Sequence, residues 1–295
     1  MSKIFRAYHV WPRFPSVSMS GNSCALNCKH CNHTYLNDMH DLTKPEDLLE
    51  SCMRFADQGA VGFLLSGGCD KSGEMLNLRK LLPFVKKIKS ETNLIIKLHT
   101  GIVDKKLAED IVDAGVDIAS VEVVGSNETI KEIFDFNATT SSYSDTLVNL
   151  KDAGVPFIVP HVCIGLHYGR LKGEFNALDM IKKYCDPSLI VFIIFRPTKD
   201  TVMENCDIPS SSDVSVVVKK AKEMFPGKDL SIGCIRPRAK YREEIELAAL
   251  KAGANRMEIP SKKTIQIAKD MGFKIRTINA CCALPEELES RAISI

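Results

Sequence analysis

The sequence has no excess of one charge and no long block of either sign. Lysine and arginine number 39 against 37 aspartates and glutamates, which gives a formal net charge of +2, and no basic run is longer than two residues. Nucleic acids and anionic membranes are usually bound through concentrated basic patches. The composition therefore predicts no nucleic-acid partner and no polybasic membrane anchor.

Long apolar runs are absent as well. The longest wholly apolar stretch, residues 189–195, has the length of a buried strand and is far too short for a membrane span. The first 15 residues contain Pro12 and Pro15 and no apolar run of the kind that a signal peptide needs. We expect a cytoplasmic protein with no membrane partner.

Linkers, internal repeats and low-complexity segments are also missing, which predicts one domain over residues 1–295. A chain of this length suits a single α/β barrel. Residues 1–15 are interpreted as an N-terminal extension, and residues 277–295 as a C-terminal tail that could cap the site.

Cysteine, in contrast, is abundant, with 11 residues. Disulfides are rare in the reducing cytosol, so grouped cysteines in such a chain favour a metal or cluster site. Three cysteines fall within residues 24–31, and Cys281 and Cys282 are adjacent. The sequence thus predicts metal ligation where the cysteines gather.

Short β-branched runs alternate with amphipathic segments along the whole chain. Such alternation predicts parallel strands joined by helices, and eight repeats indicate a (β/α)8 TIM-type barrel, full or nearly full. An open doubly wound sheet is the alternative. The expected strands are residues 16–19, 61–66, 94–99, 118–124, 157–164, 189–195, 230–233 and 256–259. The expected helices are residues 45–57, 74–89, 105–114, 143–153, 173–184, 212–224, 242–251 and 262–271.

The first cysteine group reads Cys24-Ala-Leu-Asn-Cys28-Lys-His-Cys31 and follows the first of those strands. Three thiolates at this spacing can hold three corners of an iron–sulfur cube. Three ligands leave one iron open, which is typical of a site that binds a substrate or cofactor. The alternative is a zinc site in which His30 or His33 joins Cys28 and Cys31.

This loop, together with Ser66-Gly-Gly-Cys69 after the second expected strand, resembles the radical S-adenosylmethionine (SAM) superfamily. The resemblance implies a 4Fe–4S cluster on the three cysteines, with SAM on its open iron. It also implies that Gly67 and Gly68 present carbonyls to the SAM amino group and that His30 lies against the adenine. The acidic residue that often follows the glycines is replaced by Cys69.

Polar side chains lie at or near the ends of several expected strands, where a barrel concentrates function. By analogy with the superfamily, Glu122 is a candidate for the SAM ribose, and His161 and Arg196 are further candidates for cofactor binding. His99 and His161 could equally be hydrogen-bonded lining residues. The other polar residues in these positions are Asn127, Glu128, Arg170, Lys172, Arg236 and Arg238.

Several segments resemble more closely the biotin synthase–lipoyl synthase branch, and most of all the archaeal-type two-protein lipoyl synthases. The resemblance implies a sulfurtransferase that acts in lipoate biosynthesis: a 5′-deoxyadenosyl radical attacks an octanoyl chain, and an auxiliary iron–sulfur cluster gives up sulfur. The carrying segments are residues 20–31, 66–70, 123–130, 160–166, 173–178, 233–238 and 280–283.

A sacrificial cluster requires further cysteines near the substrate. Cys234 follows the seventh expected strand, and Cys281 and Cys282 lie in the tail, so these three are the candidate ligands. Three others, Cys52, Cys163 and Cys185, are interpreted as small apolar core residues, while Cys206 belongs to a polar loop.

The expected partners follow from the resemblance: an octanoylated lipoyl carrier protein or a peptide derived from it, a second radical SAM protein, and an electron donor such as ferredoxin. One alternative keeps the superfamily and changes the reaction, to biotin-type sulfur insertion or metallocofactor assembly. The other is a zinc- or cluster-binding regulatory barrel without catalysis. No Ser/His/Asp triad and no phosphate-binding glycine loop is evident.

Overall fold

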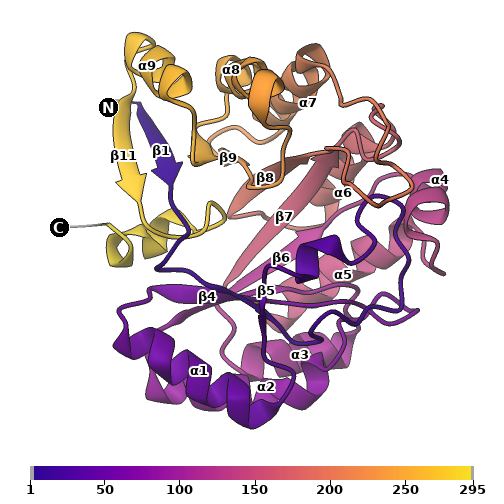
Figure 1. Ribbon diagram of the computed structural model, residues 1–295, viewed down its shortest axis with the longest axis vertical. Coiled ribbons are helices and arrows are strands. Elements are labelled where there is room, and N and C mark those ends of the chain that lie inside the picture. Colours follow the sequence, from indigo (N-terminus) through magenta and orange to yellow (C-terminus); the bar gives the residue numbers. More distant parts are fainter. Residues whose placement is uncertain (1–2, 294–295) are drawn as a thin grey trace.

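The computed structural model describes residues 3–293, which form one curved sheet with helices on its outer face (Figure 1). Within those residues the sheet has eleven strands, all parallel, in the order β11-β1-β10-β9-β8-β7-β6-β5-β4-β2-β3. The strands are β1 (Ile4–Tyr8), β2 (Ser16–Ser18), β3 (His40–Asp41), β4 (Gly62–Ser66), β5 (Ile95–His99), β6 (Ile118–Glu122), β7 (Phe157–Ile164), β8 (Leu189–Ile194), β9 (Asp229–Ile232), β10 (Arg256–Glu258) and β11 (Lys274–Ile278).

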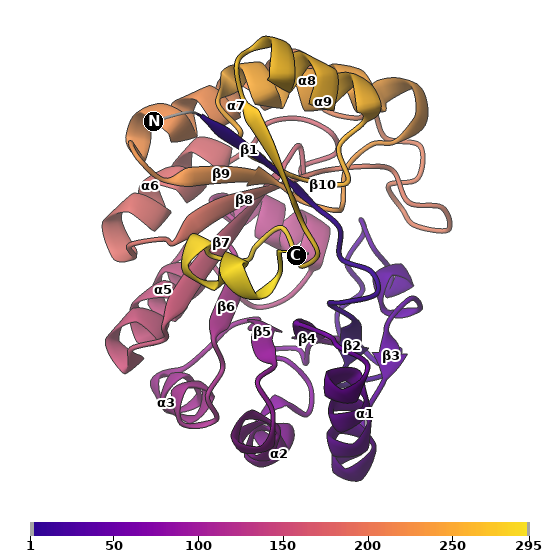
Figure 2. The same ribbon diagram turned by 90° about the vertical axis from the view of Figure 1, so that its left-hand side faces the viewer.

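The helices connect successive strands and surround the sheet, as a parallel sheet requires (Figure 2). Their starts follow local sequence signals: the Asp104 side chain caps α3, and Ser210 and Asp213 form a capping box at α7. The α-helices are α1 (Pro45–Asp57), α2 (Leu78–Glu91), α3 (Lys105–Asp113), α4 (Asn127–Thr129), α5 (Thr140–Ala153), α6 (Glu174–Tyr184), α7 (Ser211–Met224), α8 (Arg242–Ala252) and α9 (Lys262–Asp270). Short 3-10 or π segments are η1 (Thr34–Leu36), η2 (Ile130–Phe134), η3 (Ala239–Tyr241) and η4 (Glu286–Arg291).

The predicted α/β barrel is confirmed in its nearly full form. The strands curve into an arc, and the two edge strands of the sheet, β11 and β3, do not pair with each other, so the barrel stays open between them (Figure 2). The predicted N-terminal extension contains a strand of its own, because β1 pairs with both β10 and β11. Among the described residues, no helix has the length and apolar character needed to cross a membrane.

The tail after β11 lies in the middle of the arc of strands (Figure 2). Its buried residues, among them Cys282 and Leu284, pack against residues at the amino ends of the strands, such as Ile95, Ile118 and Leu189. The tail therefore caps the interior from the amino ends of the strands, opposite to the cysteine loop, which follows the carboxyl end of β2. Residues 294 and 295 of the predicted tail, and residues 1 and 2, lie outside the described part.

Candidate functional site

The cysteine loop after β2 is held by the turn after β4. The backbone N–H of Cys69 donates to the Cys24 sulfur at 3.3 Å, and the N–H of Ala25 donates to the Cys69 carbonyl at 2.7 Å. The N–H of Gly68 donates to the hydroxyl of Ser20 at 2.7 Å. The loop and the turn therefore form one unit, because β2 and β4 are neighbours in the sheet.

Gly68 touches the cysteine loop so closely that a side chain has no room. A Cβ atom there would lie 2.1 Å from the Ser23 carbonyl oxygen and 2.5 Å from the Cys24 Cβ. At Gly67 the nearest atom to such a Cβ would be the Ser20 hydroxyl oxygen, at 3.1 Å. The glycine pair thus has two different steric roles, and only Gly68 sets the approach of the turn to Cys24.

The thiols of Cys28 and Cys31 lie close together in the loop. A hydrogen bond between Cys28 and Cys31 raises the pKa of Cys28 and lowers the pKa of Cys31. One ligand atom from each of Cys28, His30 and Cys31 lies within 4.8 Å of the others. Burial lowers the pKa of His30 to about 4, so its imidazole is neutral at physiological pH. This donor set suits a soft metal centre.

A cavity of about 240 Å³ runs from this loop into the barrel. Its walls combine the cysteine loop, the glycine turn and inward-facing side chains of β4 to β8. Of the predicted cofactor-binding residues, it is lined by His30, Gly67, Gly68, Glu122 and His161. The other lining residues include Cys24, Cys28, Cys31, Ser66, Cys69, Met75, His99, Ser120, Phe134, Phe136, Tyr143 and Ile193.

Two buried polar atoms on this wall have no hydrogen-bond partner among the described residues, Nδ1 of His30 and Oγ of Ser120. Such groups are costly unless a ligand or water satisfies them. Burial also raises the pKa of Glu122 to about 7, so a hydrogen-bonding ligand there would meet a carboxyl close to its titration point. The three thiols, the glycine cradle and the unpaired polar atoms together fit a cluster and a polar cofactor such as SAM.

A chain of polar contacts leads from the glycine turn deeper into the barrel. Ser66 Oγ lies 3.4 Å from Nδ1 of His99, and Nε2 of His99 lies 3.3 Å from the Lys97 ammonium. That ammonium donates to the Cys281 sulfur at 3.3 Å. A hydrogen bond from Cys282 and the charge of Lys97 lower the pKa of Cys281 to about 5, against the effect of burial. Cys281 thus reaches the interior from the tail.

Lys97 and Ser120 were not among the site residues predicted from the sequence. The available signal was the alternation of β5, where Ile95, Lys97 and His99 share one side and Ile96 and Leu98 the other. Ile96 and Leu98 belong to the core that packs under the helices, while Ile95 packs against the tail. A lysine on the interior side of such a strand indicates that the barrel interior is polar beside it.

Arg196, a predicted cofactor-binding residue, does not line the cavity. Its guanidinium lies 5.7 Å from the ring centroid of Tyr35, and it borders a separate cleft with Arg238 and Cys206. Arg196 stands in the loop after β8, and the structure does not bring it to the wall of the cavity beside the cysteines.

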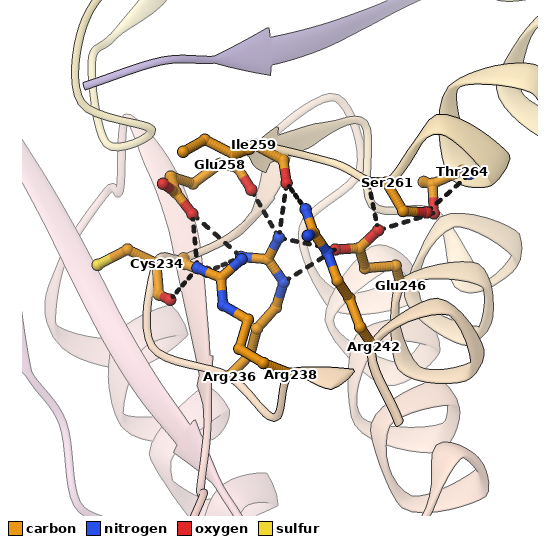
Figure 3. A network of polar contacts seen from close by, with 10 residues as sticks. Cys234, Arg236, Arg238, Arg242, Glu246, Glu258, Ile259, Ser261 and Thr264 are labelled. Atoms are coloured by element: carbon orange, nitrogen blue, oxygen red, sulfur yellow. Dashed lines mark hydrogen bonds and ion pairs between the residues drawn. The ribbon is translucent and has the colours of Figure 1, made fainter. Parts of the chain in front are cut away.

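Arg236 is a structural residue. It is fully buried and donates to Glu246 at 2.7 Å and to the carbonyls of Glu258 at 2.6 Å and Gly233 at 2.8 Å (Figure 3). Arg238 donates to the Cys234 carbonyl at 3.0 Å. The Cys234 side chain points away from this network in Figure 3. The two arginines therefore hold the chain that carries Cys234.

The cysteines interpreted as core residues lie in or against the core. Cys52 and Cys185 are buried in the core, and Cys163 is half-buried against the same core. Cys69, which stands where related sequences often have an acidic residue, lines the cavity beside Cys24, and burial raises its pKa to about 12.

Comparisons with known proteins agree with this site. Residues 19–170, more than half of the chain, match the family model of the Radical SAM superfamily. A biotin synthase of Citrifermentans bemidjiense is 23% identical over 249 residues, which are 81% of this chain and 72% of that protein. A biotin synthase of Campylobacter hominis is 25% identical over an alignment that covers 64% of this chain and 58% of that protein.

Solved structures show the same fold. The FeFe-hydrogenase maturase HydG from Carboxydothermus hydrogenoformans has a TM-score of 0.66 at 15% identity, over 95% of this chain and 69% of that one. Methylornithine synthase has a TM-score of 0.62 at 16% identity, over 97% of this chain and 86% of that one. At these identities the likeness concerns the fold alone.

Proposed function

The chain belongs to the radical SAM superfamily, and on this basis we propose that it inserts sulfur into an unactivated C–H bond of an octanoyl chain, as a lipoyl synthase-like enzyme. The observation that carries the proposal is a second group of cysteines in the same barrel. Cys281 lies at the end of the polar chain that starts at the glycine turn. A sulfur source would then face the same interior as the SAM site.

In this proposal, Cys24, Cys28 and Cys31 hold the 4Fe–4S cluster, and Gly67, Gly68, His30 and Glu122 surround SAM. When bound, SAM and its cluster would supply a 5′-deoxyadenosyl radical that removes a hydrogen atom from the substrate carbon, and an auxiliary cluster would supply the sulfur that takes its place.

The chain's own residues bind and shield the reacting groups. Gly68 lets the turn approach the cysteine loop, and the unpaired Nδ1 of His30 and Oγ of Ser120 offer hydrogen bonds to a polar cofactor. Met75, Ile102, Phe134, Phe136 and Ile193 give the cavity an apolar wall, which suits an alkyl chain and excludes water from a reactive radical.

Biotin-type sulfur insertion is the second candidate. The observation in its favour is that curated relatives at 22–25% identity are biotin synthases. The two candidates share the SAM chemistry and the need for a sulfur source, and they differ in the acceptor: an octanoyl group on a carrier protein or peptide, or dethiobiotin.

The test is anaerobic reconstitution with iron and sulfide, followed by reduction and incubation with SAM and one acceptor at a time. With an octanoyl peptide we expect formation of 5′-deoxyadenosine and of a thiolated peptide by mass spectrometry. With a perdeuterated octanoyl chain, deuterium should appear in the 5′-deoxyadenosine. Turnover with dethiobiotin alone would replace the first candidate by the second.

The matched controls are a Cys24/Cys28/Cys31→Ala triple variant and Cys52→Ala, whose thiol is buried in the core. The triple variant should lose SAM cleavage, and Cys52→Ala should keep it. A wild-type protein that binds metal but cleaves no SAM under reduction would contradict both candidates and favour a regulatory metal-binding barrel.

A further inference from the structure

Cys69 gives the cavity beside the cysteine loop a fourth thiol. Of the 11 cysteines in the chain, all of which lie within residues 3–293, only Cys24, Cys28, Cys31 and Cys69 line this cavity. The first three are the cluster ligands of the proposed function, which gives Cys69 no role. Its thiol is therefore an unused soft donor on the wall of a site where three ligands leave one iron open.

The backbone of Cys69 is fixed against the cysteine loop by both of its polar groups. Its N–H donates to the Cys24 sulfur at 3.3 Å, and its carbonyl accepts from the N–H of Ala25 at 2.7 Å. A Cβ atom on Gly68, the preceding residue, would lie only 2.5 Å from the Cys24 Cβ. The Cys69 side chain thus starts from a backbone that touches one of the cluster ligands.

A tight turn on the other side of Cys69 holds this backbone in place. Cys69 forms an antiparallel bridge with Met75, and the N–H of Asp70 donates to the Glu74 carbonyl at 2.9 Å. The Asp70 carboxylate accepts from the N–H groups of Ser72 at 2.8 Å and of Glu74 at 3.1 Å. Because the turn is closed by its own hydrogen bonds, Cys69 is preorganised beside the loop, as a ligand position requires.

His30 is the other donor that could serve an open iron in this loop. One of its ring nitrogens lies within 4.8 Å of the Cys28 and Cys31 sulfurs, and its ring packs edge-on against Phe134 with 5.3 Å between the centroids. Thiolates are the usual ligands of iron–sulfur clusters. A thiol that binds a metal ion also gives up its proton, so burial does not prevent Cys69 from acting as a thiolate ligand. The donor chemistry therefore favours Cys69.

We propose that Cys69 ligates the fourth iron of the cluster while SAM is absent and that SAM displaces it. When Cys69 binds, a sulfur–iron bond forms and the thiol proton goes to solvent. When SAM arrives, that bond breaks, the SAM donor atoms replace the sulfur and the sulfur takes up a proton, so no electron is transferred. This inference rests on the cluster of the proposed function and is independent of the sulfur acceptor.

Two properties of the protein follow from this exchange. A thiolate on the fourth iron keeps every iron of the cluster in sulfur coordination, so no iron is open to water before SAM binds. SAM must also compete with a ligand from the chain itself, which reduces its apparent affinity by the fraction of molecules in which the iron is free. Removal of the Cys69 thiol should therefore open the iron and strengthen SAM binding.

The first property is tested by Mössbauer spectra of the reconstituted protein without SAM. The spectrum of the Cys24/Cys28/Cys31→Ala variant is subtracted, so that only irons held by these three cysteines are compared. We expect no distinct iron site in the wild type and one distinct site in Cys69→Ala, as in the wild type after SAM is added. Cys52→Ala, whose thiol is buried in the core, is the matched control and should resemble the wild type.

The second property is tested by anaerobic titration calorimetry with SAM. Cys69→Ala should bind SAM about threefold more tightly than the wild type, or tighter still. Lost packing alone would weaken binding or leave it unchanged, so the direction of the change separates a ligand from a structural residue. Cys69→Ser is the second variant if the alanine protein does not fold, because an oxygen ligand or an open position would each make the fourth iron distinct.

The assignment has clear contrary results. A folded Cys69→Ala protein that keeps either the wild-type Mössbauer spectrum or the wild-type affinity for SAM would overturn it, and so would a distinct iron site in the SAM-free wild type. If His30→Gln produced the distinct site and Cys69→Ala did not, the histidine would be the ligand instead. None of these results bears on SAM cleavage or sulfur transfer by the wild type, so failure of this inference is distinguishable from failure of the proposed function.

Discussion

Gly67 and Gly68 are adjacent in one turn, yet their surroundings predict different effects of the same substitution. A methyl group at Gly68 would meet the Ser23 carbonyl at 2.1 Å and Cys24 at 2.5 Å, so the cysteine loop must move. A displacement of this size disturbs ligands that must converge on one cluster. We expect Gly68→Ala to lower iron incorporation and the rate of SAM cleavage at least tenfold.

Gly67→Ala is the matched control for this prediction. The added methyl group would meet Ser20 Oγ at 3.1 Å and Met75 Sδ at 3.4 Å, both of which can shift slightly. Its iron content should remain within about twofold of the wild type, since only flexible side-chain atoms and one backbone nitrogen lie near. Equal losses in both variants, measured by iron analysis and 5′-deoxyadenosine formation, would refute the steric argument.

Glu122 predicts a pH dependence of stability. Its pKa is about 7 in the folded protein against an ordinary value of 4.5, because burial disfavours the carboxylate. Between these two values the folded state binds the proton and the unfolded state has lost it, so the contribution of Glu122 to stability falls as pH rises. The full effect is up to about 3 kcal/mol and is complete above pH 7.

Glu122→Gln removes the titrating carboxyl and with it this pH dependence of stability. In urea unfolding of the apoprotein, the variant should gain stability relative to the wild type at pH 8 and show little difference at pH 4.5. An equal difference at both pH values would mean that Glu122 does not titrate as its burial indicates.

At the scale of elements, the strand and helix pattern was largely predictable. The expected strand at residues 16–19 is β2, and the expected strand at residues 118–124 is β6 with its following loop. The helix expected at residues 74–89 begins later, at Leu78, because the preceding residues turn back to the cysteine loop: Cys69 bridges to Met75 and accepts from Ala25. Such long-range contacts leave no periodic signal in the local sequence.

Arg236 shows how one buried side chain joins several elements. It links the segment after β9 to Glu246 of α8 and Glu258 of β10, and both Arg236 and Glu246 are 0% exposed. Arg236→Met removes the fully buried cation from between these carboxylates and leaves them only the more exposed Arg242 and Arg238 as cationic partners, which should cost about 3–5 kcal/mol of unfolding free energy. Urea denaturation measures this loss directly.

Arg242→Met is the comparison, because Arg242 pairs with the same Glu246 at 2.9 Å but its side chain is 28% exposed. Its loss should be clearly smaller, about 1 kcal/mol, since water can replace part of the contact. Comparable losses in the two variants would show that burial does not set the strength of this network.

At the scale of the whole molecule, the barrel was predictable from the sequence, but the strands formed near the two ends of the chain were not. The alternation of strands and helices indicated the parallel sheet, but no strand was predicted at β1 or β11. β1 lies in the segment interpreted as an extension, and β11 begins just before the segment interpreted as a tail. Their pairing joins residues about 270 apart in sequence, such as Ile4 with Lys274, and no short-range pattern reports a contact of this separation. For the same reason the sequence located Cys281 in the tail but not at the amino ends of the strands.

Glu289 joins the tail to β1, β10 and β11. Its carboxylate accepts from Arg6 and from Tyr8 and pairs with Arg256 and Arg276, and it is 1% exposed. Glu289→Gln leaves Arg6 and Arg256 buried with less negative charge, although Asp229 still pairs with both. The expected cost is about 3–5 kcal/mol, and it should fall mainly on the tail.

Hydrogen–deuterium exchange separates this from a general loss of stability. In Glu289→Gln, exchange should rise first in residues 279–293 and in β1, while β5 to β7 keep their protection, because the substitution frees the tail before it opens the sheet. Glu286→Gln is the matched control, since that carboxylate contacts the same Arg6 but is 63% exposed. If exchange rose uniformly through the barrel, the tail would be part of one cooperative unit with the sheet, and Cys281 could not leave the interior without global unfolding.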